Sequence, residues 1–378
     1  MFARKEKPLP KPVFEVIENS NPPVEKPAAD EGILLGDNCY WNPEALPNGH
    51  IVAIGASGSG KTQTLKAIAH ELRQTYPDIQ VVVIDFHGDQ QIDGETCYPL
   101  HMASPHGINP LVINLDTEGG GPNLQAIAVT ATLKKSLRLG PNQEGLMLDI
   151  LETCYNLRSI TQEQAATWTK QPPNFADLQK IIDGRIENGC KESVKLKLKL
   201  AATFQYGVFS RPQPEFTKKH IRIDLSKLPP EIGAIAAESL AWQLMNQHRL
   251  LGEIDGKLPR TYLFIDEAKE LKKSPACDRI IADGRKYGLG LVLASQSERH
   301  LSEDVIGNSA TKIVLPVDSS EVKKVSSKFR LGEKKVAELT PMKAICRFGK
   351  QAELVEILPY YERVEKSQKS KVKIYSGI

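Results

Sequence analysis

The chain has 378 residues, of which 40% are hydrophobic and 25% charged, and its formal net charge is +3. This composition is typical of a globular protein with a sizeable core, and so small a charge does not by itself indicate a polyanionic partner. The six cysteines show no CxxC spacing, and no apolar run approaches the ~20 residues that span a bilayer. We therefore expect a cytoplasmic protein with reduced thiols and no integral membrane segment.

Three regions follow one another along the chain. Residues 1–32 are rich in Pro, Lys and Glu, and this composition predicts a flexible tail or linker. Residues 33–360 carry the apolar patterning of one large domain. The sequence of residues 361–378 predicts a Lys-bearing C-terminal tail.

Strand-like and helix-like segments alternate within that domain. Residues 50–55 form a short apolar run that leads into a segment with helical spacing, and residues 79–86 form a near-continuous β-branched run. Residues from about 119 to 215 are mainly helical in pattern and predict an insertion after the second strand. Further strands are predicted at 220–226, 261–267, 289–295 and 311–317, with a last pair at "AICRF" and "ELVEI". The alternation predicts an α/β fold with a mainly parallel, doubly wound sheet flanked by helices.

The segment "GASGSGKT", residues 55–62, matches G-x-x-x-x-G-K-[ST] and lies between a predicted strand and a predicted helix. Its glycines allow the backbone N–H groups to form a nest, and the helix dipole adds positive charge, so that the loop suits triphosphate oxygens. In this arrangement Lys61 reaches the β- and γ-phosphates and Thr62 binds Mg²⁺. The sequence therefore predicts a site for ATP and Mg²⁺. The candidate nucleotide contacts are Gly55, Ala56, Ser57, Gly58, Ser59, Gly60, Lys61, Thr62 and Gln63.

A second motif indicates hydrolysis rather than binding alone. In "TYLFIDEAKEL" an apolar strand ends in Asp266 and Glu267, and the carboxyl ends of parallel strands lie beside the phosphate loop. Asp266 is a candidate Mg²⁺ ligand, acting through water, and Glu267 is a candidate base for the attacking water. The pair favours an ATPase over a kinase or a passive binder.

With these residues in place, the chain resembles the HerA–FtsK superfamily of P-loop motor ATPases, and most closely its HerA-like branch. The resemblance is carried by "NGHIVAIGASGSGKT", "VVVIDFHGD", "GINPL", "FIDEAKEL" and "GRKYGLGLVLASQ", in this order, over roughly residues 33–357. It makes Asp85, at the end of the second strand, a further candidate nucleotide contact. The N-terminal β-barrel of HerA proteins and the membrane segments of FtsK and the coupling proteins have no counterpart here, so we expect a minimal motor core.

The resemblance implies a RecA-like fold that assembles as a homo-oligomeric ring, usually a hexamer, hydrolyses ATP between subunits and translocates double-stranded DNA. It also implies that Gln296 senses the γ-phosphate. Arg285, which precedes the strand that ends at Gln296, would act as an arginine finger in the neighbouring subunit, with Lys286 as the alternative. We expect a nuclease or another effector as a possible partner.

Where DNA would bind is open. Residues 191–204 alternate lysines with leucines, and a strand or loop facing a ring pore could use Lys195, Lys197 and Lys199 to follow phosphates. A surface helix or edge strand with solvated lysines explains the same pattern. No signature of sequence-specific readout occurs, so any DNA would be bound through its backbone.

Two further functions compete with the translocase. A conjugative, type IV secretion motor ATPase would share "DFHGD" and "GINPL" but move protein or a protein–DNA complex. An ATP-gated regulatory ring would control a partner effector or nuclease with little translocation. Stimulation of ATP turnover by double-stranded DNA separates the translocase from these two.

Overall fold

The computed structural model describes residues 32–271 and 273–365. They form a nine-stranded sheet in the order β11-β10-β9-β3-β8-β7-β4-β6-β5, together with a separate hairpin, β1-β2. The strands are β1 (Ile33–Gly36), β2 (Cys39–Trp41), β3 (Ile51–Ile54), β4 (Gln80–Asp85), β5 (Thr96–Pro99), β6 (His220–Asp224), β7 (Thr261–Ile265), β8 (Leu289–Ser295), β9 (Thr311–Val314), β10 (Lys343–Phe348) and β11 (Gln351–Glu356).

The middle of the sheet is parallel and buried on both faces. β3 lies between β8 and β9, β7 lies between β8 and β4, and all these pairings are parallel. Every residue of β3, β7 and β8 is buried, as their continuous apolar sequences predict. Among the described strands of this sheet only β10 runs in the opposite direction, so its pairings with β9 and β11 near one edge are antiparallel. The predicted α/β fold with a mainly parallel sheet is confirmed.

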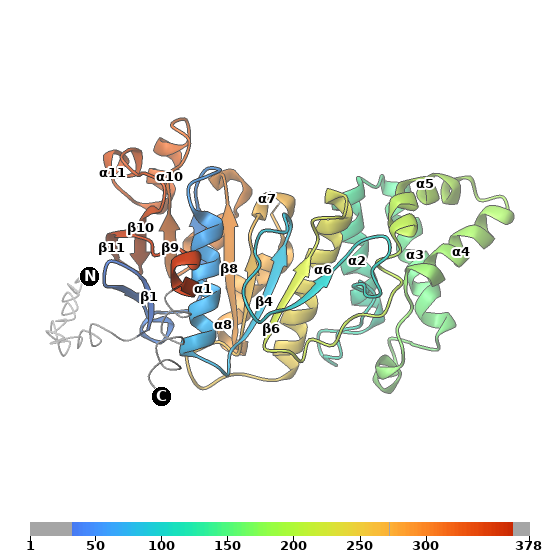
Figure 1. Cartoon of the computed structure of the whole chain (residues 1–378). Coiled ribbons are helices and arrows are strands. Elements are labelled where there is room, and N and C mark those ends of the chain that lie inside the picture. Colours follow the sequence, from blue (N-terminus) through green and yellow to red (C-terminus); the bar gives the residue numbers. More distant parts are fainter. Residues whose placement is uncertain (1–31, 272, 366–378) are drawn as a thin grey trace, which may run out of the picture.

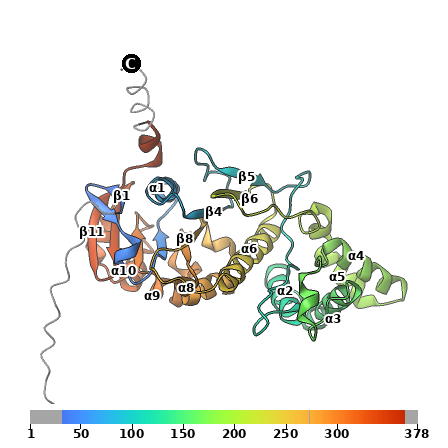
Figure 2. The same cartoon turned by 90° about the horizontal axis from the view of Figure 1, so that it is seen from below.

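Helices cover both faces of the sheet. Figure 2 shows α1 (Lys61–Thr75) on one face and α8 (Pro275–Tyr287), α9 (Glu303–Asn308) and α10 (Val322–Phe329) on the other. The sheet separates two hydrophobic cores, because alternate side chains of each strand point to opposite faces: Ile51 packs on the α1 side, and Val52 packs on the α8 side. The remaining helices outside the insertion are α6 (Pro230–Leu250), α7 (Ala268–Leu271) and α11 (Glu333–Ala337).

Four helices form the insertion, at the end of the molecule opposite β11 (Figure 1). They are α2 (Pro122–Leu137), α3 (Pro141–Leu157), α4 (Phe175–Glu187) and α5 (Lys191–Tyr206). In the chain, these helices follow β5. We did not predict this strand, because its residues are only half-buried and it ends in a proline. α2 also packs along α6, so the insertion is attached directly to a helix of the motor core.

The structure corrects two details of the sequence interpretation. Residues 191–204 lie in α5, where the buried Leu196 and Leu200 are one helical turn apart, so the hypothesis of a strand facing a pore is wrong. Lys195 and Lys197 pair with Glu192 and Asp183 on the surface.

The second correction concerns the C-terminal boundary. Residues 360–365 are helical, although the predicted tail begins at 361. The guanidinium of Arg363 is buried there and donates to Glu71 at 2.8 Å and to the Leu35 carbonyl at 3.1 Å. The rest of both predicted tails lies outside the described residues.

Within the described ranges, none of the helices combines the length and the apolar character that crossing a membrane requires.

Candidate functional site

The phosphate loop connects β3 to α1 at the carboxyl edge of the sheet. Gly58 and Gly60 have positive φ angles of 74° and 104°, a conformation that strains any residue with a Cβ. A Cβ on Gly60 would also lie 2.4 Å from the Met342 sulfur. These glycines are therefore required by the path of the loop.

Backbone hydrogen bonds hold the start of the loop against the sheet. The Gly55 N–H donates to Ser295 at 3.2 Å, the Ala56 N–H donates to Pro316 at 2.7 Å, and the Ser59 carbonyl accepts from Met342 at 3.1 Å. Ser57 and Gly58 at the tip of the loop are exposed, and Gln63 lies in the first turn of α1. No side chain caps α1, so its first N–H groups face the loop and provide donors for an anion.

Lys61 is the cation of the loop. Its ammonium donates to the Gly55 and Ala56 carbonyls at 2.7 and 2.9 Å. Burial lowers its pKa, while the negative charges of Glu267, Asp266 and Asp89 act in the opposite direction. The site therefore places one cation among several carboxylates, next to the N–H donors of α1.

Asp266 and Glu267 follow β7, as predicted, and both are buried. Asp266 accepts a hydrogen bond from the Phe86 N–H at 3.3 Å. Burial raises the pKa of Asp266 well above its ordinary value, and the charge of Asp85 raises it further. In this environment, a cation placed beside the carboxyl group strongly stabilises its ionised form.

Gln296 follows β8, the strand next to β7, and its amide donates to the Glu267 Oε2 atom at 2.8 Å. The imidazole of His87 lies 3.7 Å from the same oxygen. The other oxygen, Oε1, is buried and accepts no hydrogen bond from the described residues. Glu267 is thus oriented through one oxygen, and the other has no hydrogen-bond donor among the described residues.

Asp85 lies behind the site. Its carboxylate accepts from the N–H groups of His87, Gly88 and Gln90 at 2.7–3.1 Å and from the Arg222 guanidinium at 3.0 Å. Four donors occupy its two oxygens, so we propose that Asp85 shapes the loop after β4 and does not contact nucleotide. Arg222 is itself held by Glu95 at 2.6 Å, which makes this a buried charge network.

Oxygen ligands for a divalent cation gather where these segments meet. One carboxylate oxygen from each of Asp85, Asp89 and Asp266 lies within 4.8 Å of the others. The Thr62 hydroxyl donates to Asp89 at 3.2 Å. A hydroxyl and carboxylates are the donors that Mg²⁺ prefers, so the residues present fit this ion. Sequence reasoning missed Asp89, although an acidic residue four positions after Asp85, in the same loop, was a usable signal.

Arg285 is not part of this cluster. It lies in the last turn of α8, before β8 begins, and is therefore at the amino edge of the sheet, whereas the phosphate loop is at the carboxyl edge. Its side chain is exposed, and no carboxylate of the described residues lies within ion-pair distance of it. The neighbouring Lys286 pairs with Glu253 at 2.8 Å. Arg285 and Lys286 thus lie away from the phosphate loop of their own subunit.

Two known families match separate parts of the chain. Residues 39–114, which include the phosphate loop and Asp85, match the family described as "Helicase HerA, central domain". Residues 237–349, which include Asp266, Glu267, Arg285 and Gln296, match the "Type IV secretion-system coupling protein DNA-binding domain". No curated protein sequence matches the chain.

Solved structures share the fold at low sequence identity. VirB4 of Thermoanaerobacter pseudethanolicus is 18% identical, with a TM-score of 0.71 over 87% of this chain and 96% of that one. The plasmid coupling protein TrwB, in complex with the ATP analogue ADPNP, is 15% identical, with a TM-score of 0.59 over 86% of this chain and 88% of that one. Another TrwB structure, with ADP and Mg²⁺, is 15% identical, with a TM-score of 0.58 over 87% and 90%. With its two family matches and its RecA-like P-loop fold, the chain belongs to the HerA–FtsK superfamily of P-loop ATPases.

Proposed function

We propose that the chain is an ATP-hydrolysing motor that assembles as a ring and translocates double-stranded DNA in the cytoplasm. The observation that carries the proposal is the position of Glu267: it lies at the same sheet edge as the phosphate loop, held by Gln296 at 2.8 Å. A site that only bound nucleotide would not need a buried, oriented carboxylate with one oxygen available. Membership of the superfamily supports a motor, and six free cysteines are consistent with a reducing compartment.

The residues of one subunit divide the chemistry between them. The loop N–H groups and Lys61 hold the phosphates and stabilise the charge that develops on them. Glu267 accepts a proton from the attacking water at Oε1, while the hydrogen bond from Gln296 to Oε2 keeps the carboxylate in place. Thr62 and Asp266, with Asp89 nearby, would hold Mg²⁺, which neutralises phosphate charge when bound.

In the proposed ring, a neighbouring subunit contributes a residue to each nucleotide site. Within its own subunit Arg285 cannot reach the phosphate loop, because the two lie at opposite ends of the sheet. Arg285 is exposed, and the described residues offer it no ion pair, so it is available to a neighbour. We therefore assign it to the neighbouring subunit's ATP as an arginine finger, with Lys286 as the less favoured candidate because Glu253 already holds it.

The proposed cargo is double-stranded DNA, bound through its phosphates, and a nuclease or another effector is a possible partner. Support comes from the match of residues 237–349 to a DNA-binding domain family. The test is magnesium-dependent phosphate release with and without double-stranded DNA, for the wild type, Lys61→Ala and Glu267→Gln. Stimulation by DNA that both variants lose, and that weakens as salt rises, is the expected result.

A type IV secretion motor is the second candidate, and the same family match favours it, since that family is named for secretion-system coupling proteins. ATP turnover that DNA does not change would favour this candidate or an ATP-gated regulatory ring. The native mass, measured with and without nucleotide, then tests whether the protein assembles as a ring. A strict monomer in both conditions would contradict an arginine finger that acts between subunits.

A further inference from the structure

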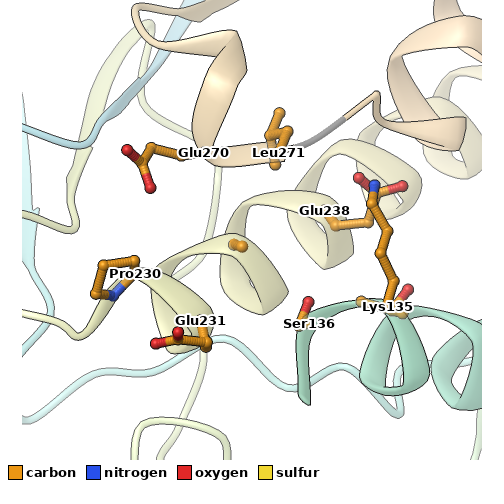
Figure 3. A pocket seen from close by; sticks show the side chains of 9 residues that line it. Lys135, Ser136, Pro230, Glu231, Glu238, Glu270 and Leu271 are labelled. Carbon is orange, nitrogen blue, oxygen red and sulfur yellow. The ribbon is translucent and has the colours of Figure 1, made fainter. Parts of the chain in front are cut away.

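Three elements meet just beyond the catalytic Glu267, and one of them belongs to the helical insertion. Figure 3 shows this junction, where α2 of the insertion faces α6 and α7. A cavity of about 30 Å³ lies between them. Its lining includes Lys135 and Ser136 from α2, Glu231 and Glu238 from α6, and Glu270 and Leu271 from α7.

The chain after Glu267 forms α7 and then leads to the start of α8. Two side chains hold its described residues, 268–271 and 273–276, which we call the connector. Glu238 of α6 accepts a hydrogen bond from the Ala276 N–H at 2.9 Å. Lys135 of α2 donates to the Lys273 carbonyl at 3.0 Å. Lys273 has a φ angle of 61°, which is unfavourable for a residue with a side chain and must be held by its surroundings. Through Lys135, the insertion therefore contacts a residue with an unfavourable backbone conformation, six positions after Glu267.

Glu238 and Lys135 also act on each other. Figure 3 shows their charged groups pointing toward one another across the cavity. Glu238 is only 4% exposed, and its Oε2 atom accepts no hydrogen bond from the described residues. Burial raises the pKa of Glu238, and the positive charge of Lys135 is among the influences that oppose this rise. A buried carboxylate with one free oxygen makes the position of the Lys135 ammonium energetically important.

We propose that Lys135 is a positioning residue through which the helical insertion sets the orientation of Glu267 and so controls the rate of ATP hydrolysis. This inference rests on the proposed ATPase function and extends it by naming the contact that links the insertion to the catalytic carboxylate.

The path from Lys135 to Glu267 is short. The Glu270 N–H donates to the Glu267 carbonyl at 3.2 Å, which ties α7 to the residue it follows. Leu271 is buried, so α7 cannot swing freely. A shift of α2 moves the Lys273 carbonyl and with it α7, and this changes the alignment of Glu267 against Gln296. Displacements of about 1 Å at a reacting group cost up to about 10²-fold in rate.

The neighbouring residue gives a matched control. Lys134 is also on α2, but its ammonium pairs with Glu144 of α3 at 2.6 Å, inside the insertion. Lys135→Met and Lys134→Met therefore remove the same charge from the same helix, and only the first one removes the contact with the connector.

The experiment measures kcat, the affinity for a non-hydrolysable ATP analogue, and amide hydrogen exchange across residues 268–276. For Lys135→Met we expect kcat to fall about tenfold with affinity within about twofold of wild type, because positioning affects the reaction and not binding. Exchange in the connector should become faster. Lys134→Met should match the wild type in all three measurements.

Glu238→Gln serves as a second variant, in case Lys135→Met does not fold. Its amide oxygen can still accept from Ala276, but the charge that faces Lys135 is gone. We expect a smaller fall in kcat, of about threefold, and the double variant should be no worse than Lys135→Met alone, since both act through one junction.

The inference is overturned if Lys135→Met keeps wild-type kcat and connector exchange, or if Lys134→Met has the same effect. In either case DNA-stimulated turnover by the wild type would leave the proposed function standing. A wild type whose phosphate release equals that of Lys61→Ala would instead overturn the proposed function, and the inference with it.

Discussion

The two edges of the central sheet differ in which ionisable groups they bury and which they expose. At the carboxyl edge, Asp266 and Glu267 are buried together beside the Lys61 ammonium, and burial raises the pKa of Asp266. At the amino edge, His50 is buried and neutral, while Arg285 is exposed. Both edges belong to the same strands, since β3 and β8 run in parallel.

This difference separates two kinds of function within one fold. Buried, uncompensated carboxylates are costly, and they persist where a cation and a substrate complete their environment. An exposed arginine costs the fold little free energy, so it can lie on a surface that a second subunit covers. In the proposed motor, one edge contains the chemistry of its own subunit, and the other presents Arg285 to a neighbour. The predictions below test this division, from the largest expected effect to the smallest.

The carboxyl edge should be the most sensitive. Glu267→Gln keeps the shape of the side chain but removes the proton acceptor, so we expect kcat to fall about 10³-fold with little change in nucleotide affinity. Phosphate-release kinetics and analogue binding measure the two quantities. Glu253→Gln is the control, because it removes a carboxylate at the amino edge, where it pairs with Lys286. Equal losses in the two variants would contradict the division.

The amino edge should matter only in the assembly. Arg285→Ala should lower kcat about 10²-fold, because a cation that stabilises transition-state charge is lost, while each subunit still binds nucleotide. Lys286→Ala should have little effect. The measurement is turnover by assembled protein, together with the native mass that shows the assembly is intact. Normal turnover by Arg285→Ala would place the finger elsewhere.

Gln296 should show an intermediate effect. Gln296→Ala frees the Glu267 Oε2 atom, which the Gln296 amide contacts at 2.8 Å, and we expect kcat to fall about tenfold because the carboxylate is less well oriented. DNA stimulation should fall as well if Gln296 couples hydrolysis to movement. A variant that hydrolyses and responds to DNA like the wild type would show that Glu267 is positioned without it.

The remaining prediction concerns stability at the amino edge and not turnover. Burial lowers the pKa of His50 to about 4, and its Nδ1 atom accepts from the Leu291 N–H at 3.0 Å. The unfolded chain binds this proton below about pH 6.5 and the folded chain only near pH 4, so stability decreases as pH falls through this window, by up to about 3 kcal/mol.

His50→Asn tests this contribution. The asparagine oxygen can replace the acceptor without a titration, so the free energy of unfolding should depend less on pH between 4 and 6.5. Denaturant unfolding at several pH values measures the difference. Parallel curves for the wild type and the variant would show that His50 titrates normally in the folded state.

Much of the parallel core could be predicted from the sequence, because strands buried on both faces leave a continuous apolar pattern. β8 was located at its observed limits, and β3, β4 and β7 were located within one or two residues. β5 was missed because it is short and partly exposed, and the β1-β2 hairpin was missed because its strands have only four and three residues. The lysines of α5 alternate with leucines by coincidence, and only the one-turn spacing of Leu196 and Leu200 reflects the fold.

The candidate site was predictable where a residue's role depends on its own strand or loop. Lys61, Thr62, Asp266 and Glu267 all lie at the predicted edge. Asp85 shows the limit of this reasoning: its place at the end of β4 was correct, but its partner Arg222 comes from β6, more than a hundred residues away. The junction between Lys135 and the connector depends on tertiary packing of the insertion against α6, which no local pattern shows.

The measurement that tests the central claim most directly is magnesium-dependent phosphate release, with and without double-stranded DNA, by the wild type and by Glu267→Gln. The account predicts turnover by the wild type that DNA increases, and a Glu267→Gln variant that binds nucleotide but turns over almost none. Turnover that Glu267→Gln retains in full, or that is equal with and without DNA, would contradict a DNA motor powered from this edge of the sheet.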